Sequence, residues 1–188
     1  MSDSPRLRGT ARREYRRLSR AADMPPRTHP VVTRTRDLPV PAEDGVVLLT
    51  DHWHAEGSSG HTVLIRTPYG RDGIAGVALF LAERGHDVVV QSCRGTFGST
   101  GTFDPLHHEV SDGQSTMRWL RAQPWATGLV HSWGGSYFGV TQWAYCDGDD
   151  RPDAMGIAIS ARRFDDASLY PGGGFSIDTP LTWAYALD

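Results

Sequence analysis

The sequence contains no lysine, and all 19 of its basic residues are arginines. It has only two cysteines, Cys93 and Cys146, which are too few for a disulfide framework and lack the spacing of metal ligands. No apolar run approaches the roughly 18 residues that a membrane span requires, and the N-terminus lacks the apolar core of a signal peptide. We therefore expect a cytoplasmic protein with reduced thiols and no membrane association.

The charge is unevenly distributed along the chain. Residues 1–36 hold ten arginines against three acidic residues, a net charge of +7, whereas the rest holds nine arginines against 19 acidic residues, a net charge of −10. The stretch RGTARREYRRLSR (8–20) is compatible with a basic helix that binds nucleic acid or an acidic surface. The alternative is a solvated arm or a leader that packs on the body, and we favour this reading. No nucleic-acid partner is expected.

The remaining pattern predicts an α/β fold with a mostly parallel sheet and an antiparallel hairpin at its N-terminal edge. Apolar and polar residues alternate on both sides of the turn Glu43-Asp44-Gly45, which indicates the hairpin. Apolar runs predict core strands and amphipathic segments predict helices, at the following ranges: strands 62–68, 86–92, 128–133 and 154–160; helices 73–85, 112–125 (N-capped by Asp112) and 136–146. A further helix begins at Asp178-Thr179-Pro180. We divide the chain into an arginine-rich arm and linker (1–36), the main domain (37–168) and the start of a helical cap (169–188).

Ser136 is the candidate catalytic residue. It lies between a predicted core strand and a predicted helix, with Gly134 and Gly135 before it and Gly139 after it. A sharp strand-to-helix turn at this place would lift the serine hydroxyl above the sheet. The amide of Tyr137, at the start of the helix, would then face the position of a developing oxyanion.

Four motifs extend this interpretation: RTPYG (66–70), QSCRGTFGSTGTF (91–103), DGQSTMRWLRAQPW (112–125) and HSWGGSYFGVTQW (131–143). In order and spacing they resemble the cocaine-esterase-like and Xaa-Pro dipeptidyl-peptidase hydrolases, which have the α/β-hydrolase fold. The resemblance covers residues from about 36 to the end. It implies that Ser136 is the nucleophile, that the Tyr137 amide is one oxyanion donor, and that the Tyr69 phenol is the second. The implied substrate is a small-molecule ester or peptide-like amide, and no cofactor is implied.

Several other residues could suggest a nucleophile or a metal site, but we expect them to have structural roles. The chain reads Gln91-Ser92-Cys93-Arg94-Gly95 where the family usually has Gln-Asp-x-Arg-Gly, so we expect Arg94 to pair with a carboxylate beneath the active-site loop. Cys93 is expected to be a small buried residue because nothing nearby would activate its thiol. The adjacent His107-His108-Glu109 lacks further spaced ligands, and no metal site is predicted there.

A base for Ser136 is missing from this sequence. None of the eight histidines follows Ser136, although the chain order in α/β-hydrolases is serine, then acid, then histidine. The carboxylates after the last predicted strand match no triad motif: Asp165, Asp166 and Asp178. The resemblance places the acid and base beyond residue 188, so we interpret the chain as an N-terminal part, truncated before the last strands and nearly inactive alone. The alternative is a non-catalytic remnant or an interaction module that uses the basic arm.

Overall fold

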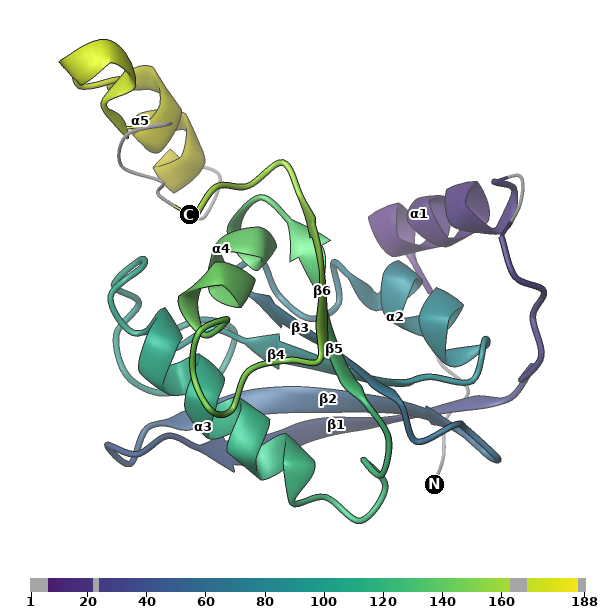
Figure 1. Ribbon diagram of the computed structural model, residues 1–188. Helices are drawn as coiled ribbons and strands as arrows, with labels where there is room; N and C mark the ends of the chain where they lie inside the picture. The colour runs from purple at the N-terminus through teal and green to yellow at the C-terminus, as the bar shows by residue number, and fades with distance from the viewer. Residues whose placement is uncertain (1–6, 22–23, 163–168, 186–188) are drawn as a thin grey trace.

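The computed structural model describes residues 7–21, 24–162 and 169–185. Its centre is a six-stranded sheet with the order β1-β2-β4-β3-β5-β6 (Figure 1). The strands are β1 (Val32–Pro41), β2 (Val47–Ala55), β3 (Thr62–Thr67), β4 (Asp87–Ser92), β5 (Val130–Gly135) and β6 (Ala154–Ala158). The helices are α1 (Gly9–Ser19), α2 (Ala75–Ala82), α3 (Glu109–Arg121), α4 (Tyr137–Ala144) and α5 (Asp178–Tyr185), with a 3₁₀ turn at Pro171–Gly173.

The pairing of the strands confirms the predicted fold class. Strands β1 and β2 form the antiparallel hairpin, and β2 also pairs antiparallel with β4. Strands β3, β4, β5 and β6 are mutually parallel, and β4, β5 and β6 are each reached through a helix, α2, α3 and α4 respectively. Gly45 has a φ of 84° in the turn of the hairpin, a conformation that glycine adopts without steric cost.

The core lies on both faces of the sheet because neighbouring strand residues point to opposite sides. On one face Val63, Ile65, Val88 and Val90 pack against α2. On the other face, Leu64 and Val89 pack against residues of α3 and its surroundings, including Met117 and Leu120. Strands β3 and β4 are buried along their whole length, which explains their continuous apolar runs.

The arginine-rich arm folds back on the body. Helix α1 lies beside α2 in Figure 1, and its Ala11 is buried in the same cluster as the α2 residues. A Cβ at Gly76 would lie 2.2 Å from the Ala11 carbonyl oxygen, so glycine permits this close approach. The Tyr15 hydroxyl donates a hydrogen bond of 2.6 Å to Glu83, just past the end of α2. Among the described residues, no helix is long and apolar enough to cross a membrane.

Two predicted elements differ from the structure in detail. Helix α3 begins at Glu109, not after Asp112, and the Asp112 side chain is buried in an ion pair instead of capping the helix. The run 154–160 was predicted to be a core strand, and this was wrong: β6 is largely exposed. Within the described sheet β6 has only one neighbour, β5, so one edge and much of its surface are uncovered.

Candidate active site

Ser136 sits at a strained turn where β5 ends and α4 begins. Its φ of 54° and ψ of −129° are outside the regions that a serine normally adopts. The Ser136 amide donates a hydrogen bond of 3.0 Å to the Ala158 carbonyl of β6, and its own carbonyl accepts bonds from the Gly139 and Val140 amides. The residue is exposed, and its hydroxyl has no hydrogen-bond partner among the described residues. The turn therefore presents a free hydroxyl at the carboxyl edge of the sheet.

Three glycines make this turn sterically possible. A Cβ at Gly134, which has a φ of 148°, would lie 2.3 Å from the Phe138 Cβ. A Cβ at Gly135 would lie 2.9 Å from the Ala158 carbonyl oxygen, and one at Gly139 would lie 2.4 Å from the Ser160 Cβ. Gly134 thus makes room for Phe138, while Gly135 and Gly139 let the turn and α4 pack against the end of β6.

Tyr137 contributes two different groups. Its amide, at the first position of α4, donates no hydrogen bond within the described part of the chain, so it is free to bind a ligand oxygen. Its side chain is buried, and the phenol donates a hydrogen bond of 2.9 Å to Glu109 while accepting one of 3.0 Å from the Leu106 amide. Burial, with the Glu109 charge, raises the pKa of this phenol far above its ordinary value. Tyr137 is thus a neutral anchor at physiological pH.

A buried ionic network lies beneath this anchor and joins the four sequence motifs. The Arg66 guanidinium is fully buried; it contacts Glu109 at 2.8 Å and donates to Gln91 at 2.8 Å. Arg94 holds Asp112 through two hydrogen bonds, of 3.1 and 2.6 Å. The expected carboxylate partner of Arg94 is therefore Asp112. Because Glu109 is occupied by Arg66 and Tyr137, it is not available as a metal ligand beside His107 and His108.

Cys93 lies inside the same network and is fully buried. Burial raises the pKa of its thiol well above the usual value, and the nearby Glu109 carboxylate raises it further. The thiol is therefore protonated at neutral pH, which agrees with the structural interpretation of Cys93.

Tyr69, on the loop after β3, reaches the same edge of the sheet as Ser136. Its ring centroid lies 5.4 Å from that of Phe138, two residues past the serine. Its hydroxyl accepts a hydrogen bond of 2.8 Å from the indole nitrogen of Trp183 in α5. Because that bond uses a lone pair of the phenol, the phenol proton remains free to bind another oxygen.

Trp183 was not identified from the sequence. Its ring also stacks on Tyr137, with centroids 5.5 Å apart and an angle of 13° between the planes. It therefore links the two residues that were predicted to supply oxyanion donors. Its only sequence signal was its place in the helix predicted to start at Asp178. It lies 46 positions beyond Tyr137 in the chain, and no local pattern of residues indicates a contact over that separation.

A cleft of about 450 Å³ opens beside Tyr69 and Phe138. Gly70, Gly73 and Ile74 also line it, and α1 contributes Thr10, Arg13, Glu14 and Arg17 to the lining. Burial raises the pKa of Glu14, an effect that the neighbouring Arg17 partly offsets. The basic arm was not expected to line the space next to a candidate catalytic residue.

Among the described residues, neither His131 nor Asp178 makes a hydrogen bond to Ser136. His131 lies near the start of β5, and its ring is 6.1 Å from that of His61. It lies five positions before Ser136, about 16 Å along an extended strand. Asp178 accepts a hydrogen bond of 2.8 Å from Ser176 at the start of α5. Asp165 and Asp166 lie outside the described residues.

Comparisons with known proteins identify the family of this chain. Residues 44–188 match the family of X-Pro dipeptidyl-peptidases (S15 family). The chain belongs to this family. Cocaine esterase from Rhodococcus sp. (strain MB1 Bresler) is 32% identical over 154 residues, which are 77% of this chain and 27% of the esterase. This S15-family chain therefore belongs to a group of hydrolases, and the predicted family resemblance is confirmed.

Solved structures establish the fold of the S15-family chain. An aminopeptidase from a marine sediment Thaumarchaeota archaeon superimposes with a TM-score of 0.65 and 22% identity, over 90% of this chain and 33% of its own. An α/β serine hydrolase without a lid from Xanthomonas campestris has a TM-score of 0.55 and 20% identity, over 66% of this chain and 60% of its own. The chain has the α/β-hydrolase fold, and it spans about a third or less of the length of the esterase and the aminopeptidase.

Proposed function

We propose that this chain carries the nucleophile and oxyanion-binding part of a serine hydrolase that acts on carboxylic esters or peptide-like amides. The observation that carries the proposal is the conformation of Ser136: a strained, exposed serine between a strand and a helix, whose hydroxyl makes no hydrogen bond to the described residues. Backbone strain of this kind costs about 1–3 kcal/mol and persists where the surrounding structure enforces it. At the carboxyl edge of an α/β-hydrolase sheet, such strain is typical of the nucleophile.

In the proposed reaction the Ser136 oxygen attacks the carbonyl carbon of the substrate, and its proton passes to a general base. The negative charge that develops on the carbonyl oxygen is bound by the Tyr137 amide and the Tyr69 hydroxyl. Trp183 supports this role because its indole donates to the Tyr69 oxygen and leaves the phenol proton for the oxyanion. The leaving group then departs with a proton from the base, and water releases the acyl group.

We propose that the general base and its acidic partner come from residues outside the 188 of this sequence. In a serine hydrolase, loss of the base alone lowers turnover by about 10⁶. This chain by itself should therefore have almost no activity toward activated esters. The arginines of α1 line the cleft beside Tyr69, so we propose that the arm contributes to substrate binding and does not bind nucleic acid.

A fluorophosphonate probe tests the role of Ser136 directly. Attack of the serine oxygen forms an O–P bond and expels fluoride, and free imidazole in the buffer supplies the missing base by accepting the proton. We expect slow labelling of the purified chain, seen as one added phosphonyl group by intact-mass spectrometry, and faster labelling with imidazole. Ser136→Ala should remove all of it, whereas Ser111→Ala, at an exposed serine of α3, should not.

The same experiment distinguishes a serine hydrolase from the alternative, a non-catalytic protein. If a folded chain and its Ser136→Ala variant take up equal amounts of probe at every imidazole concentration, Ser136 is not an activated nucleophile. Circular dichroism of both samples establishes that they are folded, so an unfolded preparation is not counted as a negative result.

A further inference from the structure

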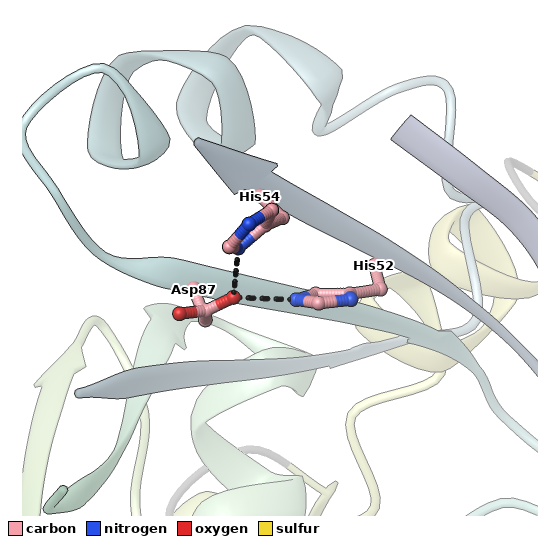
Figure 2. A group of neighbouring side chains, drawn as sticks. All are labelled: His52, His54 and Asp87. Atoms are coloured by element: carbon pink, nitrogen blue, oxygen red, sulfur yellow. Dashed lines mark hydrogen bonds and ion pairs between the residues drawn. The ribbon is translucent and has the colours of Figure 1, made fainter. Parts of the chain in front are cut away.

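A second cluster of reactive side chains lies far from Ser136. His52 and His54 occupy alternate positions of β2, so both project from the same face of the sheet (Figure 2). Strand β4 begins with Asp87, and because Trp53 pairs with Val88, Asp87 lies beside His54. The Asp87 Oδ1 lies 2.7 Å from His52 Nε2 and 2.9 Å from His54 Nδ1. Two imidazoles and one carboxylate thus converge on one point.

The surroundings hold these groups in place and leave one side open. The Asp87 side chain is fully buried and that of His52 nearly so, whereas 43% of the His54 side chain is exposed. The His52 ring stacks on Trp125 with centroids 3.9 Å apart. The Ser58 hydroxyl donates a hydrogen bond of 2.7 Å to Asp87 Oδ2, which turns the other oxygen toward the imidazoles. Hydrogen bonds of this kind, from residues around the ligands, orient metal ligands in proteins.

The cluster is not a second hydrolytic triad. In a triad the serine and the acid bind opposite nitrogens of the histidine. Here Ser58 and Asp87 both approach the same nitrogen, His54 Nδ1, at 3.4 and 2.9 Å. The cluster also cannot supply the base for Ser136, because Asp87 begins β4 while Ser136 follows the end of β5, and the two strands are parallel to β3. The two sites therefore lie near opposite ends of the parallel strands.

We infer that His52, His54 and Asp87 bind a divalent transition-metal ion such as Zn²⁺ and thereby join β2 to β4. Two imidazole nitrogens and a carboxylate oxygen are a known donor set for zinc, with water in the fourth position. Within the described residues this is the one group of three such side chains whose ligand atoms lie within 4.8 Å of one another. Without an ion, each imidazole donates the proton on its inward nitrogen to Asp87. With an ion, that proton moves through solvent to the other ring nitrogen, and the inward lone pair binds the metal.

The present spacing requires only a small adjustment. Ligands about 2.0–2.1 Å from a tetrahedral zinc ion lie roughly 3.3 Å apart, so the two distances to Asp87 must each widen by about 0.5 Å. The partly exposed His54 has the freedom to make this movement, and its open side gives the ion access.

Calorimetry with Zn²⁺ on the untagged full chain, after dialysis against a chelator, tests the inference. We expect one ion per chain, visible absorption bands with Co²⁺ that indicate tetrahedral nitrogen and oxygen ligands, and a higher midpoint of thermal unfolding with Zn²⁺. His54→Gln should weaken Zn²⁺ binding at least ~10-fold. Ser58→Ala, which removes a hydrogen bond to a ligand, should weaken it by about 10–100-fold.

Matched variants identify the binding residues. His107→Gln changes a histidine that is 72% exposed and paired with Asp104, and Cys146→Ser removes the more accessible thiol; neither should alter binding. His54 is partly exposed, so His54→Gln is expected to fold, and circular dichroism checks this. Binding that is absent in the parent chain, or that persists unchanged in His54→Gln, would overturn the inference and leave a purely hydrogen-bonded cluster. None of these readouts depends on the reactivity of Ser136.

Discussion

The phenol of Tyr137 donates its proton to the Glu109 carboxylate across 2.9 Å, directly beneath the turn that carries Ser136. Glu109 in turn neutralises the buried Arg66 on β3. The residue that follows the candidate nucleophile is therefore fixed by an ion pair between the first helix turn of α3 and the central sheet. This arrangement explains how an exposed serine can be held in a strained conformation, because the residue next to it is fixed by a buried network of an ion pair and hydrogen bonds.

Glu109→Gln should destabilise the fold strongly. The substitution leaves the buried Arg66 charge without its main partner, and breaking a buried pair from one side costs about 3–5 kcal/mol. The free energy of unfolding in urea measures the effect. Glu43→Gln removes an exposed partner of Arg118 and should cost about 0–1 kcal/mol. Equal losses in the two variants would contradict the importance of the buried network.

Tyr69→Phe should slow the labelling of Ser136 in the presence of imidazole by about 10²–10³-fold, as loss of one oxyanion donor does. The change removes only the hydroxyl, so the ring can still pack against Phe138. Tyr170→Phe is the control because this tyrosine packs on Phe175 instead. The initial rate of phosphonyl incorporation is the measurement. A rate within twofold of the parent chain would show that the Tyr69 hydroxyl does not bind the developing charge.

Gly139→Ala should lower stability through crowding alone, because the added Cβ would meet the Ser160 Cβ at 2.4 Å. Overpacking of this kind typically costs about 1–3 kcal/mol. Gly174→Ala adds the same methyl group where nothing lies within 4 Å, and it should stay within about 0.5 kcal/mol of the parent chain. Thermal unfolding followed by circular dichroism compares the two. If both substitutions are neutral, α4 does not depend on close contact with the end of β6.

Native Cys93 should resist iodoacetamide at pH 8, whereas Cys146 should react slowly. Burial raises the pKa of both thiols, so each holds less reactive thiolate at this pH than a free cysteine does, and Cys93 is also inaccessible. Peptide mass spectrometry locates the modification, and both thiols should react fully in denaturant. Modification of Cys93 at the rate of Cys146 in the folded chain would show that the network around Arg66 opens readily.

The mostly parallel sheet, the hairpin at Glu43-Asp44-Gly45 and the turn at Ser136 could be predicted from the sequence. These features depend on neighbouring residues: the period of apolar side chains, glycines that permit unusual backbone angles, and short motifs in a fixed order. The prediction was wrong for the burial of β6, because an apolar run does not show whether other parts of the chain pack against that strand.

The amino-acid sequence alone thus determined the local elements and the serine turn. Only the tertiary structure decided that Trp183 donates to Tyr69, that α1 forms a wall of the neighbouring cleft, and that Asp87 meets His52 and His54. Each of these contacts joins residues more than 30 positions apart. Such contacts depend on strand register and helix packing across the whole domain, and no local pattern of residues specifies them.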